Sequence, residues 1–325
     1  MLLNKDAAVF RMNKYGNQSK PFLFVVDFAC SHAWVAESQE SYLNGILYNF
    51  NGIVNYPVLS NSSGRIKLNP QNISFEKYSD GFKIAKSALN RGDSYLLNLT
   101  YSTPIYPDHS LSEIFYISRA KYRLLFQERF VVFSPETFIQ IRKGRISTFP
   151  MKGTIDAGIP EAEARILANS KETAEHATVV DLLRNDLSRV ATEVKVERYR
   201  YVEEIQAGNK NLLQVSSTIS GQLPADYKSH LGEILFEMLP AGSISGAPKE
   251  KTLAIIAKAE THQRGFYTGV AGFFDGENLD SCVLIRYIEK KNSDYYYKSG
   301  GGITFQSKAA EEYKELIDKI YVPFA

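Results

Sequence analysis

The chain has 325 residues, of which 44% are hydrophobic and 12% aromatic, so it has enough apolar side chains for a sizeable core. Its 38 Lys and Arg residues nearly balance 36 Asp and Glu residues without any basic run, which argues against nucleic acid as a partner. No apolar stretch is long enough to span a membrane, and the first residues lack the pattern of a signal peptide. We therefore expect a folded cytoplasmic protein that binds neither nucleic acid nor membranes.

No linker, charge block or low-complexity tract divides the chain, and we predict a single domain over residues 1–325. Cys30 and Cys282 lie far apart in the sequence, and neither belongs to a CxxC pair or a Cys/His cluster. Free thiols are therefore expected, rather than a disulfide framework or a structural zinc site.

Apolar residues recur with strand-like and helix-like periods along the chain. A buried strand is predicted over 22–28, and an amphipathic helix over 79–89 ends at the Asn-Arg-Gly segment 90–92. Apolar residues at helical spacing predict two long amphipathic helices over 160–187 and 309–320. Further strands are predicted over 212–223, 267–274, 281–290 and 295–305.

Turn-forming residues connect the last strands in pairs. The segments 275–278 (Asp-Gly-Glu-Asn) and 291–294 (Lys-Asn-Ser-Asp) have the composition of hairpin turns. Because short turns cannot join parallel strands, this pattern disfavours a doubly wound nucleotide-binding sheet. The predicted fold class is α+β, with antiparallel sheets flanked by helices.

Lys152 stands between a proline and a glycine in the segment 149–154 (Phe-Pro-Met-Lys-Gly-Thr). Residues 144–149 alternate as in a strand, which predicts that Lys152 lies at a strand-to-loop corner. A lysine held in a fixed pocket at such a corner can act as a nucleophile. The alternative is an ordinary solvated lysine, because most lysines extend their stems into water.

Two pairs of glutamates have the same three-residue spacing on predicted helices: Glu172 with Glu175, and Glu312 with Glu315. This spacing puts both carboxylates of a pair on one helix face. Four carboxylates converging from two helices would make a hard oxygen site suited to Mg²⁺ that retains several waters. Solvated helix faces are the alternative, since glutamates with this spacing are common there.

Two glycine-rich segments, 239–249 and 299–303, can each present backbone N–H groups to an anion. The first does not match a phosphate loop, because Pro248 stands before Lys249 where that motif requires glycine. Proline at this point suits the first turn of a helix over 248–259. Tight turns between strands are the alternative interpretation of both segments.

Arg286 interrupts the apolar strand predicted over 281–290. A guanidinium in such a strand needs an anionic partner or a route to solvent. The carboxylate of a ligand and an internal salt bridge both satisfy this need, and the position in the strand leaves both open.

Taken in this order, these segments resemble the chorismate-utilising enzymes over roughly residues 80–320. The resemblance implies a catalytic chorismate-binding region there, preceded by a shortened N-terminal part over 1–75. It also implies an α/β/β/α layered fold of two antiparallel sheets flanked by helices. The matching segments are 134–136, 150–154, 175–176 with 181–187, 242–249, 264–269, 285–286, and 301–303 leading to Glu312 and Glu315.

Within this family, the lysine at position 152 is similar to that of aminodeoxychorismate synthase component I, because anthranilate, isochorismate and salicylate synthases usually carry alanine there. The resemblance implies that chorismate and ammonia form 4-amino-4-deoxychorismate for p-aminobenzoate and folate synthesis. Mg²⁺ would be the cofactor, and a glutamine amidotransferase subunit would supply the ammonia. Those sibling synthases are the alternatives, and a non-catalytic chorismate-binding subunit is an alternative of another class.

The resemblance also implies roles for single residues. Lys152 would attack C2 of chorismate while Glu136 protonates the departing 4-hydroxyl group. The implied Mg²⁺ ligands are Glu175 and Glu315, with Glu172 and Glu312 acting through water. The implied substrate-binding residues are Arg286, Tyr267, Gly301 and Gly302 at the enolpyruvyl carboxylate, with Ser245, Gly246, Thr154, Lys319 and Gln214 as further members.

Three positions depart from the pattern of the family. Leu96 stands where relatives place a glutamine or a lysine that activates water, so we expect water attack at C2 to be disfavoured. Gln214 replaces a histidine found in many relatives, and Tyr287 replaces the usual threonine after Arg286.

Overall fold

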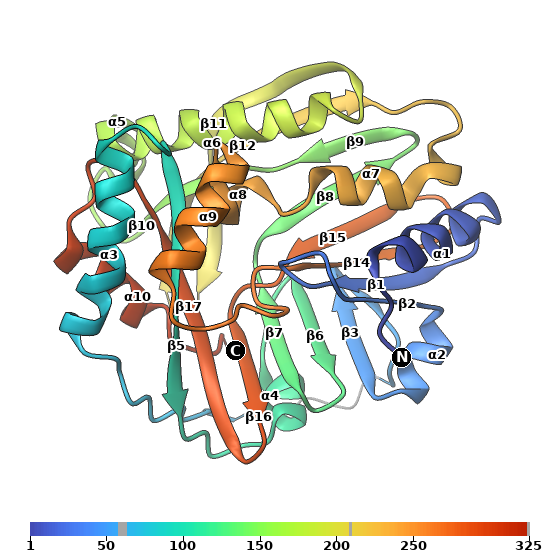
Figure 1. Cartoon of the computed structure of the whole chain (residues 1–325), viewed down its shortest axis with the longest axis horizontal. Coiled ribbons are helices and arrows are strands. Elements are labelled where there is room, and N and C mark those ends of the chain that lie inside the picture. The colour runs from blue at the N-terminus through green and yellow to red at the C-terminus, as the bar shows by residue number, and fades with distance from the viewer. Residues whose placement is uncertain (58–63, 208–209, 324–325) are drawn as a thin grey trace.

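Two antiparallel sheets form the centre of the protein in the part of the chain that the computed structural model describes, residues 1–57, 64–207 and 210–323 (Figure 1). The nine-stranded sheet contains, in order, β10 (Met151–Asp156), β12 (Lys210–Gln222), β9 (Arg145–Thr148), β8 (Thr137–Arg142), β15 (Leu279–Val283), β14 (Val270–Phe274), β1 (Phe22–Val26) and β2 (Ala33–Ala36), with β11 (Thr192–Ala207) paired to β12. The eight-stranded sheet contains β13 (Gly246–Ala247), β5 (Leu96–Ile105), β17 (Asp294–Ile303), β16 (Tyr287–Lys291), β7 (Phe130–Ser134), β6 (Tyr122–Phe126), β3 (Ile46–Phe50) and β4 (Ile53–Val54).

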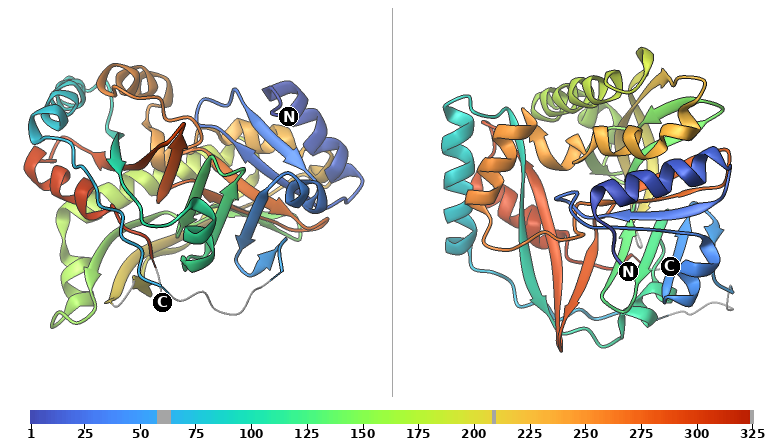
Figure 2. Two further views of the ribbon diagram at one scale, coloured as in Figure 1. Left: turned by 90° about the horizontal axis from the view of Figure 1, so that it is seen from below. Right: turned by 45° about the vertical axis from the view of Figure 1, so that its right-hand side comes forward.

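Helices cover the outer faces of the sheets. Figure 1 shows α3, α9 and α10 gathered near β5 and β17, while α1 and α7 lie at the other end near β1 and β2, and the views in Figure 2 agree. The helices are α1 (Lys5–Asn17), α2 (Ser38–Leu43), α3 (Phe75–Asn90), α4 (Leu111–Ile117), α5 (Ala162–Ala168), α6 (Ser170–Ser188), α7 (Leu231–Met238), α8 (Gly242–Ser245), α9 (Lys249–Ala259) and α10 (Ala309–Asp318), with a 3₁₀ turn at Tyr227–His230.

The side chains of β1 show why the sheets stack. Phe22, Phe24 and Val26 are buried with apolar residues of α1, α6 and α7, whereas the intervening Leu23 and Val25 are buried among side chains of both sheets. Since successive strand residues point to opposite faces, β1 buries both of its faces. The order helices, sheet, sheet, helices confirms the predicted α+β class and its α/β/β/α layering.

The predicted hairpins are confirmed, and two of the predicted elements are each divided in two. β14 pairs with β15, and β16 pairs with β17, each through the predicted turn. The helix predicted over 160–187 is two helices, because Asn169 ends α5 and its side chain accepts the backbone N–H of Glu172 to start α6. The strand predicted over 281–290 is also divided, since Arg286 has a φ of 54° between β15 and β16.

The break at Arg286 is the point where the chain crosses from one sheet to the other. β15 belongs to the nine-stranded sheet, and β16 belongs to the eight-stranded sheet. The link between β7 and β8 makes the opposite crossing at Pro135 and Glu136. Both crossings place polar residues at the junction of the sheets.

No helix in the described ranges has the length and apolar character needed to cross a bilayer.

We expect Gly81→Ala to destabilise the protein, although alanine is the better helix former. Gly81 is buried in α3, and an added Cβ would clash with the Tyr101 hydroxyl and lie 2.7 Å from the Ala259 carbonyl oxygen. Overpacking costs about 1–3 kcal/mol, which exceeds the gain of about 1 kcal/mol in helix propensity. Urea unfolding measures the change in the free energy of unfolding.

Asp80→Ala is the matched control, because this neighbouring side chain is exposed and its ion pair with Lys83 is on the surface. Its free energy of unfolding should stay within about 0.5 kcal/mol of the original protein. A Gly81→Ala protein as stable as this control would show that α3 can move away from β5 at no cost.

Candidate active site

A polar cavity of about 230 Å³ lies where the two sheets and the ends of α8 and α10 meet. Both crossings between the sheets contribute to it, through Glu136 and Arg286. Ten of the residues predicted to form the site line this cavity: Glu136, Lys152, Thr154, Gln214, Tyr267, Arg286, Gly301, Gly302, Glu315 and Lys319.

Lys152 lies within β10, so the strand-to-loop corner predicted for it is wrong, and it reaches the cavity beside a local irregularity of this strand. The pairing of β10 with β12 shifts register between Lys152 and Thr154, and Gly153 has a φ of 78°, as glycine readily allows. The Lys152 Nζ atom lies 2.9 Å from the point where a Cβ on Gly302 would stand. The amine of one sheet therefore rests against a glycine of the other, in space that a side chain at position 302 would fill.

Glu136 is held at the cavity wall by a hydroxyl group. Ser243 Oγ donates a hydrogen bond of 2.7 Å to Glu136 Oε1. Burial raises the pKa of the Glu136 carboxyl, and this effect outweighs the hydrogen bond from Ser243 and the positive charges of Lys152 and Lys319, which lower it. A carboxyl with a raised pKa is suited to donating a proton.

Arg286 and Tyr267 form another part of the lining. The guanidinium carbon of Arg286 lies 5.1 Å from the centre of the Tyr321 ring, a cation–π contact. Burial raises the pKa of Tyr267, so its phenol is neutral and can donate a hydrogen bond. A guanidinium beside a neutral phenol is a suitable donor set for a carboxylate.

The acidic residues of α10 gather beside Gly301. Glu315 Oε1 and Glu312 Oε2 lie 3.6 and 3.7 Å from the point where a Cβ on Gly301 would stand. Lys319 Nζ pairs with Glu315 Oε1 at 2.6 Å and donates to the Gly300 carbonyl oxygen at 2.9 Å. Burial lowers the pKa of Lys319, although the neighbouring Glu315 raises it.

The acidic residues of α6 lie beside β10, a strand of the nine-stranded sheet. Glu172 Oε2 lies 3.1 Å from the point where a Cβ on Gly153 would stand, and Glu175 is only 8% exposed. Glu172, Glu175 and Glu312 are not among the residues lining the cavity itself. A carboxylate of α6 thus lies close to Gly153, which follows Lys152 in β10. Carboxylates of α10 lie close to Gly301, near Lys319.

These carboxylates have the donor chemistry for Mg²⁺, which prefers oxygen ligands. Within residues 1–57, 64–207 and 210–323, however, no three His, Cys, Asp or Glu side chains lie close enough together to enclose a metal ion. This arrangement fits Mg²⁺ only with part of its shell supplied by water or substrate oxygens, which is the usual manner of magnesium binding.

Ser245 and Gly246 lie behind the cavity wall instead of lining it. Ser245 is fully buried, and its Oγ donates to the Ala241 carbonyl oxygen at 2.9 Å. Gly246 has a φ of 123° and pairs with Leu97, and a Cβ there would clash with the Leu96 carbonyl oxygen. Ser245 and Gly246 therefore have a structural role, and they hold α8 against β5.

The chorismate binding enzyme family model matches residues 18–324. The chain belongs to this family. Among relatives of this chorismate-binding enzyme, an "Uncharacterized PabA-like protein" of Haemophilus influenzae is 46% identical over 313 residues, which cover 96% of this chain and 94% of the relative. Aminodeoxychorismate synthase component 1 of Klebsiella aerogenes is 36% identical over 265 residues, which cover 77% of this chain and 57% of that protein.

Two solved structures have a similar fold. Anthranilate synthase component I of Streptococcus pneumoniae superposes with a TM-score of 0.65 at 25% identity, over 81% of this chain and 60% of that one. MenF, the menaquinone-specific isochorismate synthase of Escherichia coli, superposes with a TM-score of 0.73 over 98% of this chain and 82% of that one, and its 15% identity shows the fold alone.

Five polar residues of this chorismate-binding enzyme line the cavity but were not predicted as site residues: Asn98, Ser243, Thr268, Lys298 and Ser299. In the described part of the chain, Asn98 Oδ1 and Ser299 Oγ are buried without a hydrogen-bond partner, so they can bind a ligand. Ser299 directly precedes the glycine run and Ser243 lies within the other glycine-rich segment, so their positions were a usable signal.

Replacing Ser243 with alanine should raise the pKa of Glu136 further. The hydroxyl stabilises the charged carboxylate, so its loss favours the protonated form and moves the titration to higher pH. Infrared difference spectroscopy can follow the carboxyl band, assigned by its disappearance in Glu136→Gln.

Ser243→Thr is the matched control, since threonine keeps a hydroxyl donor at the same position. Its titration midpoint should stay close to that of the original protein. If Ser243→Ala left the midpoint unchanged as well, the hydrogen bond would not contribute to the acidity of Glu136.

Proposed function

We propose that this chorismate-binding enzyme is an aminodeoxychorismate synthase component I, which converts chorismate and ammonia to 4-amino-4-deoxychorismate. The observation that carries the proposal is the contact of the Lys152 amine with Gly302 in a cavity that also contains Glu136 and Arg286. A nucleophile, an acid and an anion-binding group are the three parts that this substitution needs. The 36% identity to aminodeoxychorismate synthase component 1 of Klebsiella aerogenes supports the same reaction.

The substrate has two carboxylates, and the cavity offers a group for each end. Arg286, Tyr267 and the backbone N–H groups at Gly301 and Gly302 bind the carboxylate of the enolpyruvyl arm. The ring carboxylate points toward the acidic residues of α6 and α10. Glu175 and Glu315 would hold Mg²⁺, with Glu172 and Glu312 acting through water, and the ion would neutralise charge at that carboxylate. Thr154, Gln214 and Lys319 complete the polar lining.

Lys152 and Glu136 carry out the first substitution. The Lys152 amine forms a bond to C2 with its nitrogen lone pair, the ring double bonds shift, and the C4–O bond breaks. Glu136 gives its proton to the departing oxygen, which leaves as water. The proton that the new C2 ammonium loses restores the acid.

Ammonia completes the exchange. It forms a bond to C4, the double bonds return to their original places, and the bond between C2 and Lys152 breaks. The enolpyruvyl group stays on the product, since no step breaks its ether bond. We propose that a glutamine amidotransferase subunit supplies the ammonia.

Leu96 favours attack by lysine over attack by water. A Leu96 methyl carbon, Cδ1, lies 3.3 Å from the point where a Cβ on Gly302 would stand, the same point that Lys152 Nζ approaches. An apolar side chain beside the amine gives water no hydrogen-bond partner there. This supports amination over the hydroxylation that isochorismate synthases perform.

The identity of the product tests the proposal. Purified protein with chorismate, Mg²⁺ and an ammonium salt should form 4-amino-4-deoxychorismate, separated by chromatography and identified by mass. Activity should disappear with EDTA and return with added Mg²⁺. Formation of anthranilate or isochorismate would assign a sibling reaction, and chorismate binding without turnover would indicate a non-catalytic subunit.

Lys152→Ala tests the covalent route separately. With ammonia as the donor, kcat should fall at least about 100-fold, because the substitution loses its nucleophile. Lys83→Ala is the matched control, since that lysine is exposed on α3 and should leave the rate unchanged. A Lys152→Ala enzyme with full ammonia-dependent activity would refute the covalent intermediate without refuting the product.

A further inference from the structure

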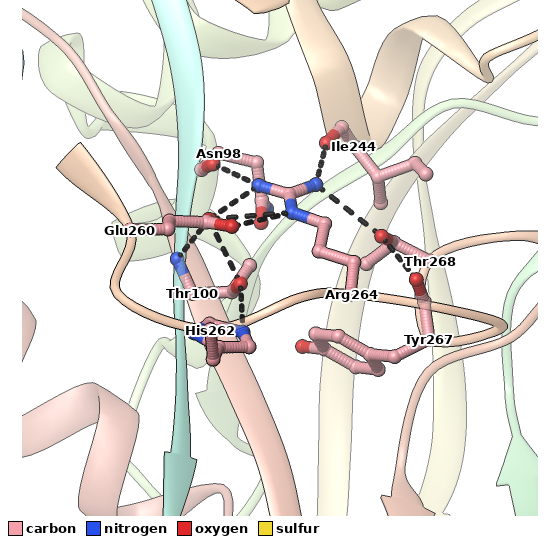
Figure 3. Close-up of polar contacts among 8 residues, drawn as sticks. All are labelled: Asn98, Thr100, Ile244, Glu260, His262, Arg264, Tyr267 and Thr268. Carbon is pink, nitrogen blue, oxygen red and sulfur yellow. Dashed lines mark hydrogen bonds and ion pairs between the residues drawn. The ribbon is translucent and has the colours of Figure 1, made fainter. Parts of the chain in front are cut away.

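Arg264 is a buried arginine whose guanidinium uses every donor it has (Figure 3). Its Nη1 atom donates to the Ile244 carbonyl oxygen at 3.0 Å and to Thr268 Oγ1 at 3.2 Å. Its Nη2 atom donates to the Asn98 carbonyl oxygen at 2.6 Å and to Glu260 at 2.7 Å, and Nε donates to Glu260 at 2.9 Å. All five N–H groups of the fork are therefore paired.

The three neutral acceptors belong to the wall of the candidate active site. Asn98 lies on β5, Ile244 on α8, and Thr268 in the turn before β14, and all three line the cavity. Two of the bonds go to main-chain carbonyl oxygens, so they fix the backbone of β5 and α8 directly. One side chain thus joins three separate elements of the wall.

The bond to Thr268 has a further consequence. Thr268 has a φ of 61°, which is unfavourable for a β-branched residue and persists only where surrounding contacts hold it. Its hydroxyl accepts from Arg264 and donates to the Tyr267 carbonyl oxygen at 2.6 Å. Arg264 therefore reaches Tyr267, a proposed substrate-binding residue, through one intervening hydroxyl.

Further contacts fix the position of Arg264 itself. Glu260 follows the end of α9, and its carboxylate also accepts from the backbone N–H and the hydroxyl of Thr100 at 2.9 and 2.8 Å. The guanidinium carbon lies 4.3 Å from the centre of the Phe28 ring. Lys298 Nζ donates to the Arg264 carbonyl oxygen at 2.8 Å. Glu260 therefore balances the charge of Arg264, and Phe28 packs against its planar group.

We propose that Arg264 is a positioning residue of the active site. It sets the distances between the parts of the cavity wall that contain Asn98, Ile244 and Thr268, and it does not touch the substrate. The proposal rests on the cavity being the catalytic site given under the proposed function. Lysine cannot replace Arg264, because a single ammonium group cannot span acceptors on three elements.

A second cleft makes the proposal testable. It has a volume of about 920 Å³, and its lining includes Arg264, Glu260, Phe28 and Pro240 but none of Lys152, Glu136 and Arg286. A small cation can therefore reach the space left by a shortened Arg264 side chain from this outer cleft.

The experiment measures chorismate consumption by Arg264→Ala and Arg264→Lys, with and without added methylguanidinium. Arg264→Ala should lose about 100-fold or more in kcat, the cost of displacing reacting groups by about 1 Å, with a smaller rise in KM because Arg286 still anchors the substrate. Millimolar methylguanidinium should raise the kcat of Arg264→Ala at least tenfold and leave the kcat of the original enzyme unchanged. Arg264→Lys should stay impaired.

Arg123→Ala is the matched control. Arg123 is also buried, and it donates to the carbonyl oxygens of Phe115 and Ser118 and to the Tyr56 hydroxyl, and none of these residues lines the cavity. It should lower the melting temperature as Arg264→Ala does, yet keep kcat within about twofold once the folded fraction is matched.

Equal loss of kcat in both variants, or no rescue by methylguanidinium, would overturn the positioning role. Because chorismate consumption is the readout, a product other than 4-amino-4-deoxychorismate would refute the proposed function and leave this test intact. If the original protein consumes no chorismate, calorimetry of chorismate binding replaces kcat, with weaker binding and methylguanidinium rescue expected for Arg264→Ala alone.

Discussion

The stacking of two apolar sheet faces is the constraint on which the rest of this structure depends. Each sheet must bury one face against the other and the opposite face against helices, so the chain has to cross repeatedly between the layers. Crossings interrupt the ladders of backbone hydrogen bonds, and this is where polar residues can stand without breaking a strand. Glu136 and Arg286 occupy two such crossings, which is why the cavity forms at the junction of the sheets.

Charge balance is the second condition that this junction must meet. Lys319 pairs with Glu315, and Arg264 pairs with Glu260, so these two cations have anionic partners close by. Glycines at 153, 301 and 302 supply the space for these groups, because a side chain at any of them would meet a carboxylate or an amine. The glycine-rich segments are thus explained by close approach of side chains as much as by turns.

Several features could be predicted from sequence because their causes are local. The hairpins at 275–278 and 291–294 follow from turn residues, and the helices over 79–89 and 309–320 follow from apolar spacing. The break at Asn169 was missed because apolar spacing continues through it, although asparagine is a good N-cap. The break at Arg286 was missed because the flanking residues are uniformly apolar, and only the change of sheet requires it.

The sequence by itself determined the antiparallel α+β class, the family and ten residues of the cavity lining, since each depends on motifs and periodicities within short segments. The tertiary structure alone decided that Lys152 rests against Gly302, that Ser243 binds Glu136, and that Ser245 and Gly246 stand behind the wall. It alone also linked Arg264 to three elements. These relations join residues far apart in the chain, and packing between the layers, which no local pattern encodes, sets their distances.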